Sequence, residues 1–164
     1  MRKLLKHSYL RCAALVVFSS ALDARDSLPS PTAVRAVVLP HPLREALEVP
    51  RTAAQERSNP IQVGFLVRLH EKKNLDVLMR AVRDVSHEAR LVVAGDGPAS
   101  YRKQLRELSV ELEMTEQIES LGFLEGSRKW NFLDGIDILA MPSKYECFGM
   151  VAAEAMARGT ATVV

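Results

Sequence analysis

From residue 61 to residue 164, short apolar runs alternate with longer stretches whose apolar residues recur at helical spacing. The apolar runs are Ile61–Val67, Arg90–Ala94, Gln117–Leu121, Ile136–Met141 and Thr160–Val164. The stretches between them predict helices over Asn74–Val85, through Leu105, Leu108 and Leu112, near Arg128–Leu133 and over Gly149–Ala157. Parallel strands need a crossover of about a dozen residues. The alternation therefore predicts βαβ units, and the right-handed crossover rule favours a doubly wound parallel sheet of the α/β class.

Composition and charge narrow the possible functions. With 164 residues, of which 48% are apolar and 26% charged, the chain can bury one ordinary core but not two complete ones. The 22 basic and 20 acidic residues are interleaved, which argues against a nucleic-acid-binding face. Cys12 and Cys147 lie far apart and have no partners at metal spacing, so neither a disulfide framework nor a zinc site is expected. A reducing, cytoplasmic location fits this composition best.

The first 58 residues differ from the rest and predict a separate part of the protein. A basic start followed by the apolar run at residues 13–20 is typical either of a signal peptide or of a buried strand ending in a polar turn. The run is too short to span a bilayer, and we favour the strand. Residues 28–60 are rich in Pro and Arg and hold one further apolar stretch, Val34–Leu39, as expected for a connector with one strand. We therefore expect one part over residues 1–58 and a second over residues 59–164.

In doubly wound sheets, ligands bind at the carboxyl ends of the strands where the strand order reverses, here between the first and fourth strands of the second part. The turn after the first strand carries Arg68 to Asn74, and the turn after the fourth carries Pro142 to Met150. These are the two richest clusters of functional side chains in the chain. Topology alone therefore predicts that they converge on one site.

Two glutamates flank the start of the last predicted helix. Glu146 precedes it and Glu154 lies inside it, while Phe148, Gly149 and Met150 would offer the unpaired backbone N–H groups of a helix N-terminus to an anion. The alternative is that Glu146 caps the helix and that Glu154 is a solvated surface charge. Because alanines and Met156 surround Glu154, the helix is expected to be packed, and its single acid then needs a polar partner.

Two cations, Arg68 and Lys73, bracket the other turn and can neutralise a departing diphosphate. The alternative is a solvated basic turn.

Gly95–Pro98 lacks the lysine and spacing of phosphate loops and indicates a turn. The four histidines show no ligand spacing, and Asp134 and Asp137 do not form a D-x-D pair, so no metal site is expected.

Four ordered motifs give the second part a family resemblance. They are Val63 to Asn74 (VGFLVRLHEKKN), Val93 to Pro98 (VAGDGP), Ser120 to Phe123 (SLGF) and Met141 to Gly159 (MPSKYECFGMVAAEAMARG). Together they resemble glycosyltransferase family four, over about residues 59–164. Residues 10–45 are similar, more loosely, to the end of that family's first domain and its hinge. The resemblance implies the Rossmann-like, nucleotide-sugar-binding C-terminal half of a GT-B glycosyltransferase, cut at both ends.

The resemblance also implies roles for individual residues. Arg68 and Lys73 would bind the diphosphate of the donor, and Glu146 would hold hydroxyls of its sugar. The family motif assigns main-chain donors to Phe148, Gly149 and Met150, the ribose hydroxyls to Glu154, and the base to main-chain atoms around Leu124. Transfer would retain the anomeric configuration, with the leaving phosphate accepting the acceptor's proton, and it would need neither a metal ion nor another cofactor.

Two departures from the family pattern bear on activity. Val67 stands where the family usually has glycine, and its branched side chain would narrow the approach to the diphosphate. The chain also stops at Val164, before the family's Gly-Gly and acidic segment, and most of the acceptor domain is not in it. The acceptor, whether a sugar, a lipid or a small molecule, is therefore not readable, nor is any peripheral membrane contact through that domain. We expect the 164 residues alone not to transfer sugar, and a non-catalytic Rossmann-like nucleotide-binding module is the alternative function.

Overall fold

A computed structural model describes residues 13–28, 35–43, 48, 59–85, 89–146 and 148–164. The chain divides into two compact units, Met1–Pro42 and Leu43–Val164, which are described separately. Most residues between Leu43 and Asn59 lie outside the described part, so the predicted boundary after residue 58 stays a prediction. Within the described part, no helix is both long enough and apolar enough to cross a bilayer.

The first unit is a parallel strand pair joined by a helix. Strand β1 (Val16–Phe18) pairs with β2 (Ala36–Val38), and helix α2 (Ala21–Ser27) lies between them in the chain. The two predicted strands are therefore confirmed. The helix was missed, although its start carries a signal: Ser20 caps it, the hydroxyl accepting from the Asp23 backbone N–H at 3.1 Å.

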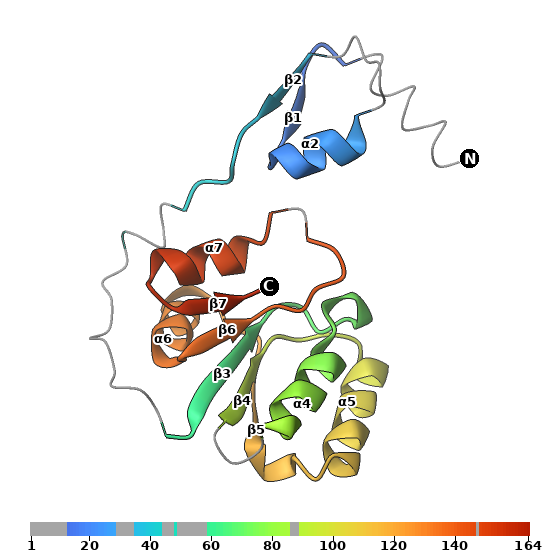
Figure 1. Cartoon of the computed structure of the whole chain (residues 1–164), viewed down its shortest axis with the longest axis vertical. Coiled ribbons are helices and arrows are strands. Elements are labelled where there is room, and N and C mark those ends of the chain that lie inside the picture. Colours follow the sequence, from blue (N-terminus) through green and yellow to red (C-terminus); the bar gives the residue numbers. More distant parts are fainter. Residues whose placement is uncertain (1–12, 29–34, 44–47, 49–58, 86–88, 147) are drawn as a thin grey trace. The chain divides into compact units, whose positions relative to one another are not determined.

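The second unit is a five-stranded parallel sheet in the order β5-β4-β3-β6-β7 (Figure 1). Its strands are β3 (Ile61–Leu66), β4 (Ala89–Ala94), β5 (Ile118–Gly122), β6 (Ile138–Ala140) and β7 (Ala161–Val163). Its helices are α4 (Leu75–Asp84), α5 (Ala99–Glu111), α6 (Gly126–Gly135) and α7 (Met150–Ala157), with single 3₁₀ turns at Glu71–Lys73 and Thr115–Gln117. The predicted doubly wound sheet is confirmed, and the strand order reverses between β3 and β6.

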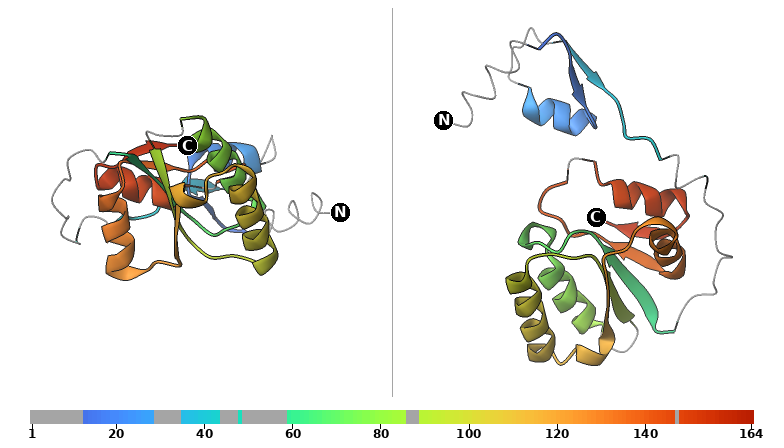
Figure 2. Two further views of the ribbon diagram at one scale, coloured as in Figure 1. Left: turned by 90° about the horizontal axis from the view of Figure 1, so that it is seen from below. Right: turned by 180° about the vertical axis from the view of Figure 1, so that it is seen from behind.

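Helices cover both faces of this sheet, α4 and α5 on one side and α6 and α7 on the other (Figure 2). The central strands are apolar on both faces: Phe65 and its neighbour Leu66, 0% and 6% exposed, belong to different core clusters. Such continuous burial is expected of central parallel strands. Trp130 and Leu105 are core residues, as predicted.

Asp134 and Asp137, which were not expected to bind a metal ion, both have structural roles. Asp137 anchors β6 beside β3, because its Oδ2 accepts from the Gln62 backbone N–H at 2.8 Å and its own N–H donates to the Gln62 carbonyl at 3.0 Å. Asp134 forms a two-point ion pair with the fully buried Arg158, whose Nε donates to Oδ1 at 2.6 Å. The hydrogen bond from Arg158 to Asp134 raises the pKa of the Arg158 guanidinium above its ordinary value, so the guanidinium stays charged although it is buried.

The Gly95–Pro98 segment is a turn that packs tightly against the chain leaving β3. The Leu69 N–H donates to the Asp96 carbonyl at 2.9 Å, and the Gly95 N–H donates to the Gly122 carbonyl at 2.7 Å. Gly95 has a φ of +147°, and a Cβ there would lie 2.0 Å from the Val67 carbonyl oxygen. Close approach of two backbones therefore requires glycine at this position.

We predict that Gly95→Ala lowers the free energy of unfolding by about 3 kcal/mol or more, because the methyl group meets a backbone oxygen that cannot move independently. Gly122→Ala is the matched control: its φ of +68° is also unfavourable for alanine, but no atom lies within 4 Å of the added Cβ. That variant should lose only about 1 kcal/mol. Urea unfolding of both variants tests this, and equal losses would contradict the proposed backbone clash.

Candidate functional site

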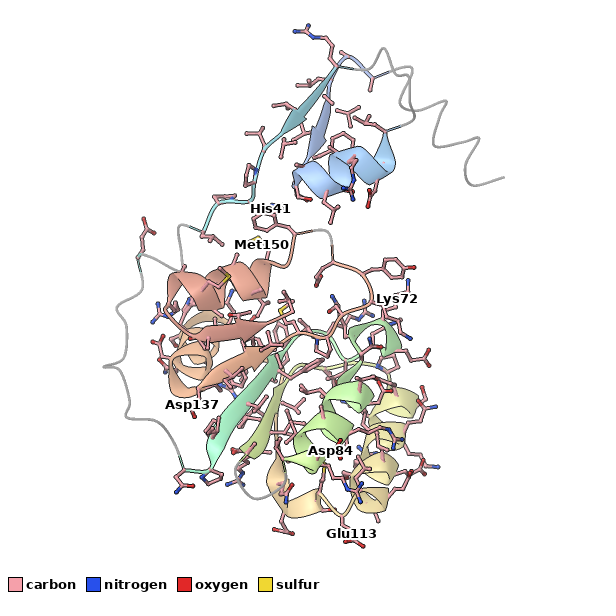
Figure 3. The ribbon with its side chains drawn as sticks, viewed as in Figure 1. His41, Lys72, Asp84, Glu113, Asp137 and Met150 are labelled. Carbon is pink, nitrogen blue, oxygen red and sulfur yellow. The ribbon has the colours of Figure 1, made fainter. Side chains whose placement is uncertain are left out.

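The turns after β3 and β6 meet at one edge of the sheet. Lys72, after β3, and Met150, at the start of α7, lie at this edge, whereas Asp84, Glu113 and Asp137 lie toward the opposite edge (Figure 3). Because parallel strands all end at the same edge, β3 and β6 deliver their turns to the point where the strand order reverses. The predicted convergence of the two clusters is confirmed.

Two hydrogen bonds join the turns directly. The Asn74 side-chain amide donates to the Pro142 carbonyl at 2.7 Å, and the Lys144 backbone N–H donates to the Lys72 carbonyl at 2.9 Å. Asn74 has a left-handed backbone, with φ 52° and ψ 39°, a conformation that asparagine tolerates better than most residues. We refer to these two hydrogen bonds as the turn latch. Asn74 belongs to the first of the sequence motifs, but its hydrogen bond to Pro142 could not be predicted without the fold.

Lys73 and Glu146 form an ion pair across the turns. The Lys73 Nζ lies 2.5 and 3.0 Å from the two Glu146 carboxylate oxygens, and the side chains are 21% and 33% exposed. The N-cap of α7 is Gly149, which has no side chain to cap the helix, and the Glu146 carboxylate is paired with Lys73. The solvated-turn interpretation of Lys73 is wrong, because Lys73 is partly buried and paired.

The α7 N-terminus follows this ion pair. Gly149 has φ 76° and ψ 50°, which lets the chain turn sharply into the helix at Met150. Phe148, Gly149 and Glu146 line a cavity of about 370 Å³, together with Ser143. The first N–H groups of any helix have no partner within it. Met150, at the first position of α7, does not line this cavity, and Cys147 lies outside the described residues.

Glu154 is buried and paired, so its interpretation as a solvated surface charge is wrong. It is 8% exposed, and its Oε1 accepts from the Lys129 Nζ at 2.7 Å. Its other oxygen, Oε2, is also buried and finds no donor among the described residues. Lys129 was not predicted as a site residue, because nothing near residue 129 signals a partner 25 positions away on another helix.

Arg68 lies in a second cavity of about 410 Å³, which we call the Arg68 cavity. Leu124, Lys129, Val67 and Val151 also line it. Arg68 is exposed and Leu124 is 7% exposed. Val67 stands beside Arg68 in the wall of this cavity, and the narrowing of the approach to a diphosphate by its branched side chain stays a prediction.

The predicted residues therefore gather into two subsites. Arg68 and Leu124 line the Arg68 cavity together with Lys129, which forms an ion pair with Glu154. Glu146, Phe148 and Gly149 line the other cavity, and Glu146 forms an ion pair with Lys73.

One further cavity is lined by none of the predicted site residues. This cavity of about 400 Å³ between α5 and β5 is lined mainly by apolar residues such as Leu105 and Ile118. Among the residues that the structure describes, no three His, Cys, Asp or Glu side chains are grouped as metal ligands.

Comparisons with known proteins identify the family of this chain. The family described as glycosyl transferases group 1 matches residues 50–164. An uncharacterised glycosyltransferase of Methanocaldococcus jannaschii is 38% identical over 102 residues, which are 61% of this chain and 26% of that protein. The chain spans about a quarter of the length of this relative.

Solved structures share the fold. Anabaena HepE, in complex with UDP and glucose, has a TM-score of 0.77 at 20% identity over 98% of this chain and 46% of its own. The C-terminal domain of a glycosyl transferase group 1 family protein of Francisella tularensis has a TM-score of 0.57 at 23% identity, covering 65% of this chain and 58% of its own.

We predict that Asn74→Gly lowers the free energy of unfolding by about 1 kcal/mol, because it removes the side-chain donor of the turn latch but suits the left-handed backbone. Asn74→Ala should lose about 2 kcal/mol, since it adds the cost of a left-handed alanine. Chemical denaturation of both variants measures the two costs separately. Wild-type stability of the glycine variant would show that the hydrogen bond to Pro142 contributes nothing.

Proposed function

This chain belongs to the glycosyl transferases group 1 family, and from that membership we propose that it is the nucleotide-sugar-binding half of a retaining, metal-independent glycosyltransferase. The observation that carries the proposal is the meeting of Lys73, Glu146 and the α7 N-terminus where the strand order reverses. This combination offers a cation, a hydroxyl acceptor and backbone donors to one ligand. A nucleotide diphosphate sugar presents the complementary groups.

Arg68 and Lys73 are proposed to bind the diphosphate. Both follow β3, where their charges can neutralise the negative charge that grows on the leaving nucleoside diphosphate. Backbone N–H groups of Phe148, Gly149 and Met150 would add dipoles of the same sign. These groups can meet the diphosphate charge without a divalent ion.

Glu146 is proposed to accept hydrogen bonds from the donor sugar. Its carboxylate is paired with Lys73 at 2.5 Å. Donor binding would exchange that ion pair for two new contacts, from Lys73 to phosphate and from sugar hydroxyls to Glu146. The exchange keeps Lys73 paired with an opposite charge and Glu146 hydrogen-bonded, which limits the desolvation cost of filling the site.

The nucleoside is proposed to occupy the Arg68 cavity. The Glu154 Oε2, which has no donor among the residues that the structure describes, would accept from a ribose hydroxyl, and main-chain atoms near Leu124 would contact the base. HepE binds UDP, and the fold shared with it supports a nucleotide in this half of the protein. The base itself is not assigned.

In the proposed reaction, the bond between the anomeric carbon and the diphosphate oxygen breaks, and the acceptor oxygen bonds to that carbon from the same face. The acceptor's proton passes to the departing phosphate oxygen. The products are a glycoside and a nucleoside diphosphate. No side-chain base is needed, so the residues of this chain serve to bind, orient and neutralise charge.

The acceptor is proposed to be held outside this chain, on an acceptor-side domain that would determine whether it is a sugar, a lipid or a small molecule and whether a membrane surface is contacted. A cytoplasmic location is proposed for the whole protein. The 164 residues alone would then bind donor without transferring it, since the second reactant is not positioned.

We predict that Glu146→Gln weakens binding of UDP-glucose about tenfold or more but does not weaken UDP binding, because UDP carries no sugar to contact Glu146 and the substitution releases Lys73 from its ion pair. Glu154→Gln, the matched control, should weaken both ligands by the same factor, because the ribose is common to them. Isothermal titration of the chain measures all four affinities. A non-catalytic nucleotide-binding module would instead show equal, small effects of Glu146→Gln on both ligands.

We also predict that donor binding does not need a divalent cation, because Arg68, Lys73 and the α7 N-terminus supply the positive charge. Excess EDTA should change the affinity of the chain for UDP-glucose by less than twofold, whereas Lys73→Met should reduce it at least tenfold. Affinity that is lost in EDTA and returns only with added Mg²⁺ or Mn²⁺ would contradict metal independence.

A further inference from the structure

Among the residues that the structure describes, Lys129 is the one cation of the second unit that both contacts a proposed ligand-binding carboxylate and lines a cavity. Its Nζ lies 2.7 Å from the Glu154 Oε1 and 4.1 Å from the centre of the Trp130 ring, and its side chain is 22% exposed. It lines the Arg68 cavity from α6, whereas Glu154 reaches the pair from α7. The Glu154 side chain is 10% exposed and its Oε2 has no donor among the described residues.

The pair solves an electrostatic problem at this position. A carboxylate that is nine-tenths buried is costly unless it is paired. A lone carboxylate here would also repel a diphosphate bound at Arg68. Lys129 offsets both effects, and because it binds Oε1 it leaves Oε2 as the carboxylate oxygen of Glu154 that has no donor among the described residues.

Other contacts hold Lys129 itself in place. The buried Trp130 ring, 3% exposed, is approached by the Lys129 ammonium and by the Arg158 guanidinium, whose Cζ lies 5.5 Å from the ring centre. Arg158 is in turn fixed by Asp134. The position of the Lys129 ammonium is therefore determined by α6 and α7 together and does not depend on a bound ligand.

We propose that Lys129 is a positioning residue that orients Glu154 toward the ribose, so that recognition of a ribonucleotide depends on the Lys129–Glu154 pair rather than on Glu154 alone. This inference rests on the proposed function, because it requires a nucleotide in the Arg68 cavity. In this proposal the ribose hydroxyls donate to one carboxylate oxygen, the Glu154 Oε2. A purely structural lysine would affect all ligands alike, and so would a lysine that only attracts the diphosphate.

The test compares each nucleotide with its 2′,3′-dideoxy analogue. Isothermal titration of the 164-residue chain with UDP, GDP and their dideoxy analogues gives the ribose discrimination, defined as the dissociation constant of the analogue divided by that of the nucleotide. One hydrogen bond to a charged acceptor predicts a discrimination of about tenfold or more for the wild type. Lys129→Met should reduce it below about threefold, and Lys129→Arg, which keeps the charge, should restore most of it.

Arg68→Met is the matched control, since it removes a cation from the same cavity without touching Glu154. It should weaken the nucleotide and its analogue equally and keep the discrimination. Lys129→Ala, which admits water to Glu154 and so avoids a dry unpaired charge, is measured in parallel in case Lys129→Met does not fold, with the same expected result. Circular dichroism checks the fold of each variant.

Each outcome separates the two proposals. Wild-type discrimination retained by folded Lys129→Met or Lys129→Ala would overturn the positioning role and leave nucleotide binding intact. A wild-type chain that binds nucleotides without discrimination would overturn it too. A wild-type chain that binds neither UDP nor GDP would overturn the proposed function and this inference with it.

Discussion

The parallel pairing of β3 with β6 is the constraint on which the site depends. It is short, with Val63 opposite Ile138 and Gly64 opposite Leu139, and Asp137 anchors its start by two hydrogen bonds with Gln62. A Cβ on Gly64 would lie 2.3 Å from an Ile136 side-chain carbon, so α6 and its exit pack directly on this junction. Because the pairing places the ends of both strands side by side, the turn latch can join the two functional turns.

Charge in this site is organised in pairs. Lys73 holds Glu146, Lys129 holds Glu154, and behind them Arg158 holds Asp134. Exposure of the carboxylate side chains falls along this series, from 33% for Glu146 through 10% for Glu154 to 2% for Asp134, whereas Lys129 is about as exposed as Lys73 and only Arg158 is fully buried. The more exposed pair can exchange partners with a ligand at low cost, whereas the buried pair is expensive to break and suits a purely structural role. Lys129 and Glu154 lie between these limits, which fits a pair that both supports the fold and keeps one oxygen for a ligand.

Much of the fold and most of the candidate site could be predicted from local patterns, and the misses share a cause. Helix α2 was not predicted, although Ser20 and Asp23 signal its start, because the apolar run before it is the stronger local pattern. Glu146 was left open between cap and ligand group, since only the fold shows that Lys73 neutralises the carboxylate. The roles of Asn74 and Lys129 were not foreseen, because their partners lie 68 and 25 residues away.

By itself, the sequence determined the alternation of strands and helices, the direction of the sheet and the two turns that carry the functional groups. These follow from hydrophobic periodicity and from the length that a parallel crossover needs, both of which are local properties of the chain. Tertiary structure alone decided which charges neutralise one another and which carboxylate oxygen stays without a donor in the described part of the chain. Those outcomes depend on distances of about 3 Å between helices and turns that are remote in sequence, and no local pattern encodes such distances.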